Sequence, residues 1–340
     1  MTETNEKIRR GMAVQCITVI VCLAPFLFLG AEASGYEILN YRDKLNRTVE
    51  IRIPVDRAVI YQTYEMIPAL QIWDKVVGIG RYAYDNDLIK AVKPDVADKI
   101  PAAGTGLDLN FEALMALKPQ VIITWTVQPA VIKFMEERGF NVISIYPDSL
   151  QELYGVMEVH GRLFGKESRL GQCVSEMEKV FDIVRNHTKD HAELPRKRVL
   201  WIGGKPTNVA CGDGLTNELI AMNAGTNVAG DLRGSNVEAS MEQILAWDPE
   251  VIFIWGHAKY NADTILSSAQ WRFVKAVRDG KVYKAPVWNT WSPRIALLAL
   301  WMGTKIYPES YRNFDLTGVF DAFYRRVFGI PYAKVKAVDE

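Results

Sequence analysis

The sequence predicts an α/β protein of two lobes with mostly parallel sheets, and two observations predict it. The first is a fifteen-residue segment that occurs twice, as FEALMALKPQVIITW at 111–125 and as MEQILAWDPEVIFIW at 241–255. The copies align without a gap at an offset of 130 residues, and six of the fifteen positions are identical. The second observation is a long stretch of helical periodicity between the copies. At 340 residues the chain has the length of two medium-sized domains.

Each copy of the repeat has the pattern of a short amphipathic helix, a proline turn and a continuous apolar strand. A strand that is apolar throughout is usually buried on both faces of its sheet. Short ungapped matches also arise by chance, so the evidence for two lobes rests equally on the strands and helices around each copy. They alternate between strand and helix, which favours a mostly parallel sheet in each lobe. In the first series we expect strands at 48–53, 58–60, 75–77, 121–125 and 142–145 and helices at 65–72, 111–117 and 129–138. In the second we expect strands at 198–202, 251–255 and 282–284 and helices at 215–223 and 269–278.

Residues 149–190 predict the helix that joins the lobes. Apolar residues recur there every three or four positions, charges occupy the other face, and proline is absent. Gly161 and Gly165 are expected to bend or divide it. The predicted organisation is therefore an N-terminal lobe at 36–148, a linking helix at 149–190, a C-terminal lobe at 197–307 and a helical extension at 308–340.

Residues 1–33 have the order of residues found in a secretory signal peptide. Basic residues precede an apolar run at 12–29, and Ala31 and Ala33 follow where a signal peptidase requires small side chains. We expect cleavage after Ala33 and a periplasmic protein. The alternative is an uncleaved membrane anchor, since the apolar run approaches spanning length.

Composition narrows the function. Lysine plus arginine equals aspartate plus glutamate at 40 each, so the net charge gives no indication of a nucleic-acid partner. After cleavage only Cys173 and Cys211 remain, too few for a disulfide-built scaffold. They could pair, but we interpret them as small buried apolar residues.

Several segments, taken in order, resemble one known family. They are NRTVEIRIP at 46–54, DKVVGIG at 74–80, LKPQVII at 117–123 and NAGTNVA at 223–229. The arrangement resembles the periplasmic binding proteins of ABC importers for iron siderophores, haem and cobalamin, over about residues 36–307. The resemblance implies two Rossmann-like lobes joined by one rigid helix, no enzymatic activity and no resident cofactor. It also implies a monomer that delivers a metal chelate to a permease dimer in the membrane, and a ferric siderophore is the expected cargo.

In that family each lobe presents an exposed glutamate that docks on the permease, and the matching residues here are Glu112 and Glu242. Both are expected in the first turn of a helix, after the N-cap residues Asn110 and Ser240, where the helix dipole favours a carboxylate. Gln243 and Ser240 could form a capping box. The alternative is that these glutamates stabilise their helices and do nothing else.

Ligands of open α/β sheets bind beyond the carboxyl ends of the strands. The residues at those positions here are aromatic with a few cations, which suits a large, partly planar chelate with acidic groups. Trp125 could equally be the last buried residue of its strand, and Trp288, Trp291 and Arg294 could pack between the lobes. The residues expected to contact the ligand are Tyr64, Arg81, Tyr84, Trp125, Lys205, His257, Trp288, Trp291 and Arg294.

Other functions fit the sequence less well. His187 and His191 are four residues apart in a charged stretch that we interpret as solvated surface, so no site for a bare metal ion is expected. The GxGxxA pattern at 78–83 matches a dinucleotide fingerprint, but no long helix is predicted to follow it. A tetrapyrrole metal chelatase and a membrane-tethered sensor remain as alternatives, and so do haem or a corrinoid as cargo.

Overall fold

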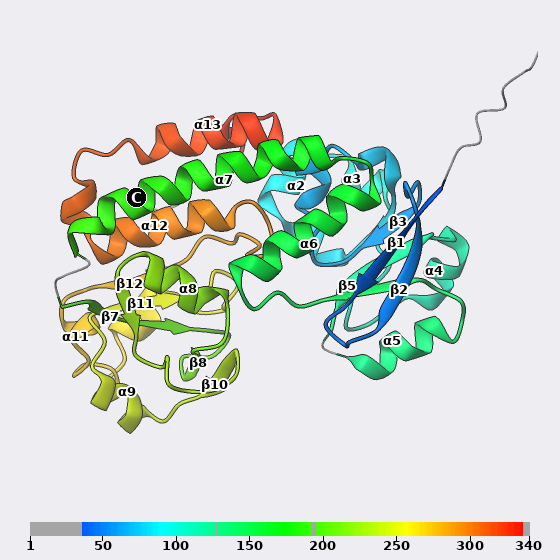
Figure 1. Cartoon of the computed structure of the whole chain (residues 1–340). Helices are drawn as coiled ribbons and strands as arrows, with labels where there is room; N and C mark the ends of the chain where they lie inside the picture. Colours follow the sequence, from blue (N-terminus) through cyan, green and yellow to red (C-terminus); the bar gives the residue numbers. More distant parts are fainter. Residues whose placement is uncertain (1–35, 127, 192–194, 336–340) are drawn as a thin grey trace, which may run out of the picture. The chain divides into compact units, whose positions relative to one another are not determined.

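The computed structural model describes residues 36–126, 128–191 and 195–335 (Figure 1). The predicted signal peptide at 1–33 and its cleavage site lie outside the described residues. Within the described residues, no helix has the length and apolar character needed to cross a membrane.

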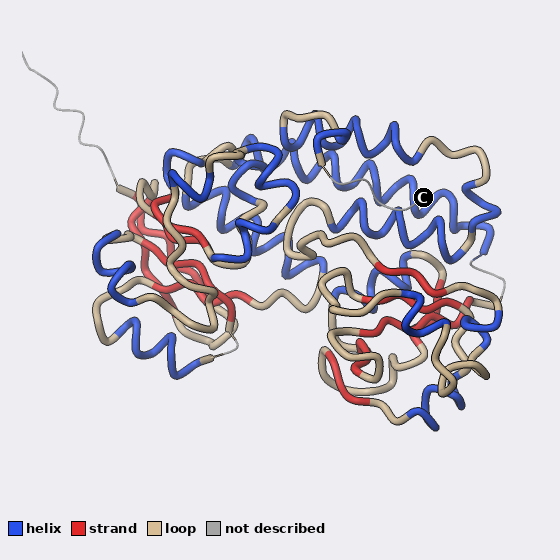
Figure 2. Tube along the Cα trace, turned by 180° about the vertical axis from the view of Figure 1, so that it is seen from behind, coloured by secondary structure: helices blue, strands red, loops and turns tan. Residues whose placement is uncertain are grey.

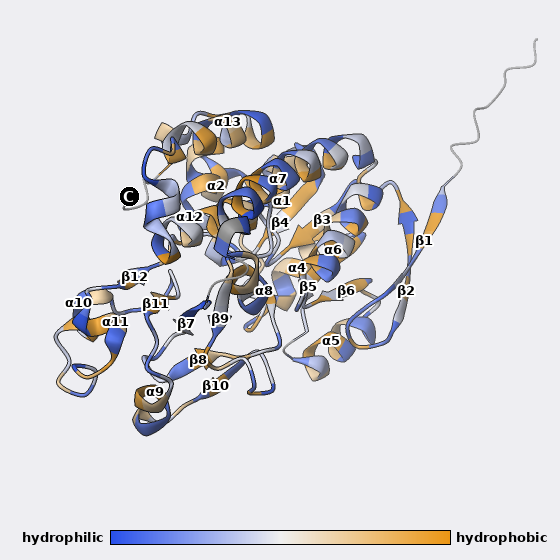
Figure 3. Cartoon of the chain, turned by 60° about the vertical axis from the view of Figure 1, so that its left-hand side comes forward, coloured by the Kyte–Doolittle hydropathy of each residue, from blue (hydrophilic) through white to orange (hydrophobic). Residues whose placement is uncertain are grey.

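The N-terminal lobe contains a four-stranded parallel sheet in the order β4-β3-β5-β6. Its strands are β3 (Ala58–Ile60), β4 (Val76–Ile79), β5 (Val121–Trp125) and β6 (Val142–Ile145). Its helices are α1 (Met66–Leu70), α2 (Asp87–Val92), α3 (Val96–Lys99), α4 (Phe111–Leu117) and α5 (Pro129–Glu136), with 3-10 turns η1 (Trp73–Lys75) and η2 (Arg81–Asp85). An antiparallel hairpin of β1 (Glu37–Arg42) and β2 (Thr48–Ile53) precedes this sheet, and β2 alternates strictly between exposed and buried residues. Figure 3, coloured by hydropathy, shows both hydrophilic and hydrophobic residues along the hairpin.

The C-terminal lobe repeats this order with an addition. Its parallel strands lie in the order β9-β7-β11-β12, and β8 and β10 extend the sheet in antiparallel fashion. Its strands are β7 (Lys197–Ile202), β8 (Asn208–Ala210), β9 (Gly225–Asn227), β10 (Asn236–Glu238), β11 (Val251–Ile254) and β12 (Val282–Lys284). Its helices are α8 (Leu215–Met222), α9 (Met241–Trp247), α10 (Ala262–Leu266) and α11 (Lys275–Arg278). Figure 2 shows the strands of each lobe gathered together with helices around them.

The predicted linking helix is divided in two. Helix α6 (Leu150–Leu163) ends before Gly165, which adopts a φ of 60° that residues with a side chain rarely adopt, and α7 (Glu167–Thr188) follows. Helix α7 then packs against α1 of the N-terminal lobe and α8 of the C-terminal lobe. The linker is therefore a helical pair, and its second helix contacts a helix of each lobe.

After the second sheet the chain returns to α7. Helices α12 (Ile295–Ile306) and α13 (Leu316–Phe328) both pack along it, and 3-10 turns η4 (Pro308–Tyr311) and η5 (Tyr332–Lys334) follow them. Helix α12 is buried on nearly every face. One core, built around α7, α12 and α13, receives one face of both sheets, and each sheet buries its other face in a core of its own. This two-sided burial explains why β3, β5 and β11 are apolar at successive positions.

The two copies of the repeat have the same backbone structure. Asn110 accepts a hydrogen bond from the N–H of Ala113, and Ser240 accepts the equivalent bond from Gln243 and forms the expected capping box. Both helices end on a non-glycine residue whose backbone is in the left-handed region. These residues are Lys118, with a φ of 45°, and Asp248, with a φ of 40°.

An arginine fixes each of these turns. The Nε of Arg57 donates to the carbonyl of Lys118 at 3.3 Å, and the Nε of Arg198 donates to the carbonyl of Asp248 at 3.1 Å. The next strand begins with the same backbone bond in both lobes, from Gln120 to the Arg57 carbonyl and from Glu250 to the Arg198 carbonyl, each 2.8 Å. The duplication predicted from sequence is thus confirmed at the level of caps, turns and sheet register.

Some sequence expectations were wrong in detail. The helix expected at 269–278 begins only at Lys275, because Val274 is extended. His187 and His191 are not solvated surface, since their rings stack on Tyr311 and Tyr307 at 4.4 and 3.9 Å. Cys173 and Cys211 are free and buried, which confirms the apolar interpretation.

The buried His160 predicts a pH dependence of stability. Its Nδ1 donates to the carbonyl of Val156 at 2.7 Å, its Nε2 lies 2.8 Å from the Thr63 hydroxyl, and burial lowers its pKa from 6.5 to about 4. Between these values the unfolded chain binds a proton that the folded chain does not, so stability should fall as pH falls, by about 3 kcal/mol in total. Urea unfolding between pH 4 and 7 measures this slope. His160→Gln should flatten it, and an unchanged slope in that variant would assign the pH dependence to other groups.

Candidate functional site

The predicted ligand residues lie at the ends of the strands of both lobes or in the loops that follow them. In the N-terminal lobe, Tyr64 and Arg81 lie in the loops that follow β3 and β4, and Trp125 is the last residue of β5. In the C-terminal lobe the loops follow β7, β11 and β12 and carry Lys205, His257 and the segment 288–294. These residues lie at or beyond the carboxyl ends of strands, and burial decides which of the side chains a ligand can reach.

Arg294, just before α12, forms a buried ion pair with Glu65, just before α1. Both side chains have no exposed surface, and the Nε of Arg294 donates to Glu65 at 2.9 Å while its Nη2 donates to the other carboxylate oxygen. The Nη1 donates to Asp87 at 2.8 Å and to the Tyr324 hydroxyl at 3.1 Å. Burial alone would lower the pKa of Arg294, but the negative charges of Glu65 and Asp87 outweigh it and raise that pKa. The guanidinium is therefore permanently charged, and four hydrogen bonds hold it within the protein.

Glu65 also ties the loop after β12 to the N-terminal lobe. It accepts hydrogen bonds from Asn86 at 2.8 Å and from the Ser292 hydroxyl at 2.5 Å. The amide of Asn289 donates to the carbonyl of Gln62, and its side-chain oxygen accepts from the backbone N–H of Trp291 at 2.9 Å. The ion pair therefore positions Trp291 through the loop that carries it.

Three of the residues predicted to contact the ligand are buried. Arg294 is fully buried, Trp288 is buried against Phe320, and Tyr64 is buried beside Glu65 and Asn86. A fourth, Tyr84, donates its hydroxyl to the carbonyl of Ile100 at 2.6 Å and supports its own loop. We therefore leave these four residues out of the candidate ligand site.

The accessible aromatic residues form a row that joins the two lobes. Trp291 meets Tyr146 edge to face with ring centroids 5.2 Å apart, and meets Trp125 in the same way at 6.5 Å. All three rings are partly exposed. On the C-terminal lobe, Trp255 is 42% exposed and its ring lies 5.1 Å from that of His257. Such rings supply flat faces on which a planar ligand can stack.

Two buried polar atoms at this row lack a partner. The Nε1 of Trp125 and the Oε1 of Gln62 form no hydrogen bond with the described residues. Both atoms lie beside Gly106, where a Cβ atom would come within 3.1 Å of the first and 3.3 Å of the second. Buried groups of this kind are usually satisfied, so exceptions are candidates for ligand contact.

Two of the predicted cations are exposed to solvent. Arg81 and Lys205 are exposed, and the Lys205 ammonium has only a 4.0 Å contact to Glu238. Desolvation lowers the pKa of the partly exposed His257, and Glu65 and Arg294 also act on it, so its ring lies within electrostatic range of the ion pair. The accessible set thus combines stacking surfaces, hydrogen-bond donors and positive charge.

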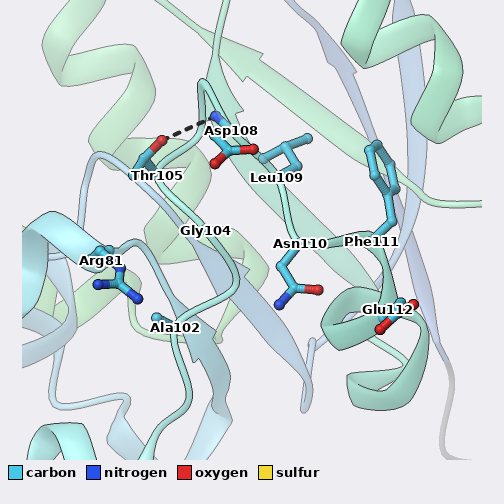
Figure 4. Close-up of a pocket in the computed structure, with 9 residues that line it drawn as sticks. All are labelled: Arg81, Ala102, Gly104, Thr105, Asp108, Leu109, Asn110, Phe111 and Glu112. Atoms are coloured by element: carbon cyan, nitrogen blue, oxygen red, sulfur yellow. Dashed lines mark hydrogen bonds between the residues drawn. The ribbon is translucent and has the colours of Figure 1, made fainter.

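A pocket of about 590 Å³ connects Arg81 with the start of α4 (Figure 4). Its wall is the loop from Gly104 to Asn110, and Glu112 lies at its far side. Glu112 and Glu242 are both exposed at the second position of their helices. Hydrogen bonds from its own backbone N–H and from Ser240 lower the pKa of Glu242. Neither glutamate forms an ion pair within the residues that the structure describes.

Comparison with known proteins shows which family the chain belongs to. A family model described as "Periplasmic binding protein" matches residues 58–287. The chain belongs to the periplasmic binding protein family. It is a solute-binding protein and not an enzyme, so the chelatase alternative does not hold. The GxGxxA pattern accordingly leads into the 3-10 turn η2 and not into a long helix.

Individual relatives agree with this assignment. The binding protein is 23% identical to the molybdate-binding protein MolA of Haemophilus influenzae, over 92% of this chain and 96% of that protein. It is 22% identical to an iron-uptake system-binding protein of Bacillus subtilis, over 74% and 80% of the two chains. Among solved structures, Helicobacter pylori CeuE in a nickel–histidine complex superposes with a TM-score of 0.78 at 21% identity, covering 88% of this chain and 98% of that one.

Sequence reasoning missed the buried pair because the segment 288–294 looks like a polar surface loop. A signal was nevertheless present. The residues after Arg294, IALLALWMG, are apolar on every face of a helix, which places the start of that helix in a core. A buried arginine requires a carboxylate partner, and Glu65 follows a buried strand of the other lobe.

The binding protein should depend strongly on this pair. Glu65→Gln removes one charge and leaves Arg294 buried with only Asp87, which should cost about 3 kcal/mol of unfolding free energy. Glu37→Gln is the matched control, because Glu37 pairs with Arg162 at 2.8 Å on the surface and should contribute less than about 1 kcal/mol. Urea denaturation compares the two, and equal losses would show that the buried pair is energetically neutral.

Proposed function

We propose that this binding protein carries an anionic metal chelate, foremost a ferric siderophore, through the periplasm to an ABC importer. The observation that carries the proposal is the accessible row of Trp125, Tyr146 and Trp291, together with the exposed cations Arg81 and Lys205. Aromatic faces stack on the planar groups of a chelate, and the cations neutralise its negative charge. Export through residues 1–33 belongs to the same proposal.

Haem and corrinoids remain alternatives within the same site, because both are large and planar. A small oxyanion is the second candidate function, and a separate observation favours it. The unpartnered Nε1–H of Trp125, beside Gly106, can donate a hydrogen bond to an oxygen of one compact anion. A relative that matches 92% of this chain is named for molybdate binding.

Within the described residues there is no group of three or more histidine, cysteine, aspartate and glutamate side chains able to hold a metal ion. A metal carried by this protein is accordingly proposed to arrive inside a chelate, as cargo. The protein then contributes stacking, charge and hydrogen bonds, and the chelate supplies the metal ligands.

Calorimetric titration separates the ligand classes. A ferric catecholate siderophore should bind, and Arg81→Ala and Trp291→Leu should each weaken its binding about tenfold through lost charge pairing and stacking. Arg272→Ala and Trp247→Phe are the controls, since these residues lie elsewhere on the C-terminal lobe. Binding of molybdate alone would select the second candidate. Absence of binding for siderophore, haem, cobalamin and molybdate would reject the whole assignment.

For delivery, we propose that Glu112 and Glu242 contact cationic residues of the permease. Replacing both by alanine should lower ligand uptake about tenfold and leave ligand affinity unchanged, because the glutamates lie outside the aromatic row. Asp98→Ala and Asp263→Ala, in the first turns of α3 and α10, are matched controls. Normal uptake by the double glutamate variant would show that the carboxylates only stabilise their helices.

A further inference from the structure

The two copies of the repeat share an exposed apolar position as well as buried ones. Met115 is 57% exposed and Leu245 is 36% exposed, and they occupy the same position of the two copies. The adjacent Leu114 and Ile244 have no exposed surface and supply the helix-to-sheet contact. Packing within the lobes therefore accounts for 114 and 244 but gives no reason for large apolar side chains at 115 and 245.

The exposed residues lie on one helix face with the glutamates. Glu112, Met115 and Ala116 are spaced i, i+3 and i+4 on α4, and Glu242, Leu245 and Ala246 have the same spacing on α9. All six are exposed. Each face therefore consists of an acidic residue, a large apolar residue and a small alanine that allows close approach. We call these two faces the α4 face and the α9 face.

The surroundings of the α4 face leave it open to a partner. A hollow of about 420 Å³ beside Met115 is lined by Phe111, Glu112, Met115 and Arg138. Arg138 does not neutralise Glu112, because its guanidinium lies over the Phe134 ring, 3.1 Å from the ring centroid. The face thus presents a free negative charge next to apolar surface.

We propose that Met115 and Leu245 are apolar anchors that insert into two identical sockets, one on each copy of a two-fold permease dimer. The proposal rests on the proposed function and deepens its docking step. Two equivalent surfaces on one chain match a partner that offers the same socket twice, as a symmetric dimer does. Each socket should be complementary to the face that it receives. We expect an apolar floor that contacts the anchor and a cationic rim that pairs with the glutamate.

Site-specific photo-crosslinking tests the proposal without knowledge of the ligand. The full-length protein is expressed in its own host with Met115→p-benzoylphenylalanine or Leu245→p-benzoylphenylalanine, irradiated, and the adducts are mapped by mass spectrometry. Both positions should react with the same peptide segment of one polytopic membrane protein. Ile38 and Phe273, which are 47% and 58% exposed outside the two faces, carry the same probe as controls and should not react with that segment.

Three results would overturn the proposal. They are adducts to different membrane proteins or unrelated segments, adducts equal to those of the controls, and covalent dimers of this chain, which would assign the faces to self-association. None of these outcomes depends on the cargo, so failure here is distinct from failure of the ligand titration.

A second measurement separates the anchors from the glutamates. The combined variant Met115→Gln and Leu245→Gln should weaken binding to the crosslinked permease, reconstituted in lipid nanodiscs, by about tenfold per site. Ile38→Gln with Phe273→Gln is the control and should bind like the native protein. Undiminished binding by the anchor variant would overturn the proposal even if the glutamate variant were defective.

Discussion

The buried ion pair between Glu65 and Arg294 is the constraint on which the arrangement around the junction of the lobes depends. A charged guanidinium without solvent contact is tolerated only where carboxylates and hydrogen bonds surround it, and Glu65, Asp87 and Tyr324 supply them. Because Glu65 precedes α1 and Arg294 precedes α12, the pair joins a loop of one lobe to a helix start of the other. It thereby withdraws Arg294 from any ligand and positions Trp291 to meet one.

The fold is the product of one unit used twice. In each lobe a capped helix ends on a residue with a left-handed backbone, and a proline turn follows. The next strand then lies between equivalent neighbours, β5 between β3 and β6 and β11 between β7 and β12. Two copies of such a unit place equivalent side chains on equivalent surfaces. The family assignment suggests what these surfaces do, because a solute-binding protein of an importer must bind that importer. The α4 and α9 faces are the equivalent exposed surfaces that we propose for this contact.

The sequence predicted what depends on local patterns and missed what depends on tertiary contact. Strands β5 and β12 were predicted well because a short apolar run between turn residues has few alternatives. Helix α12 was missed since a helix buried on every face has no amphipathic period, and β8 and β10 are too short to show alternation. Trp125 and Trp291 were correctly placed near the ends of strands, but only coordinates could show that Trp288 and Arg294 are buried.

A crystal structure of the protein with a ferric catecholate siderophore tests the central claim most directly. The account predicts that the chelate contacts Trp125, Trp291 and Arg81, while Arg294 keeps its bonds to Glu65 and Asp87. A chelate bonded to Arg294, with its pair to Glu65 broken, would contradict the claim that this pair is structural. So would a chelate bound away from the aromatic row.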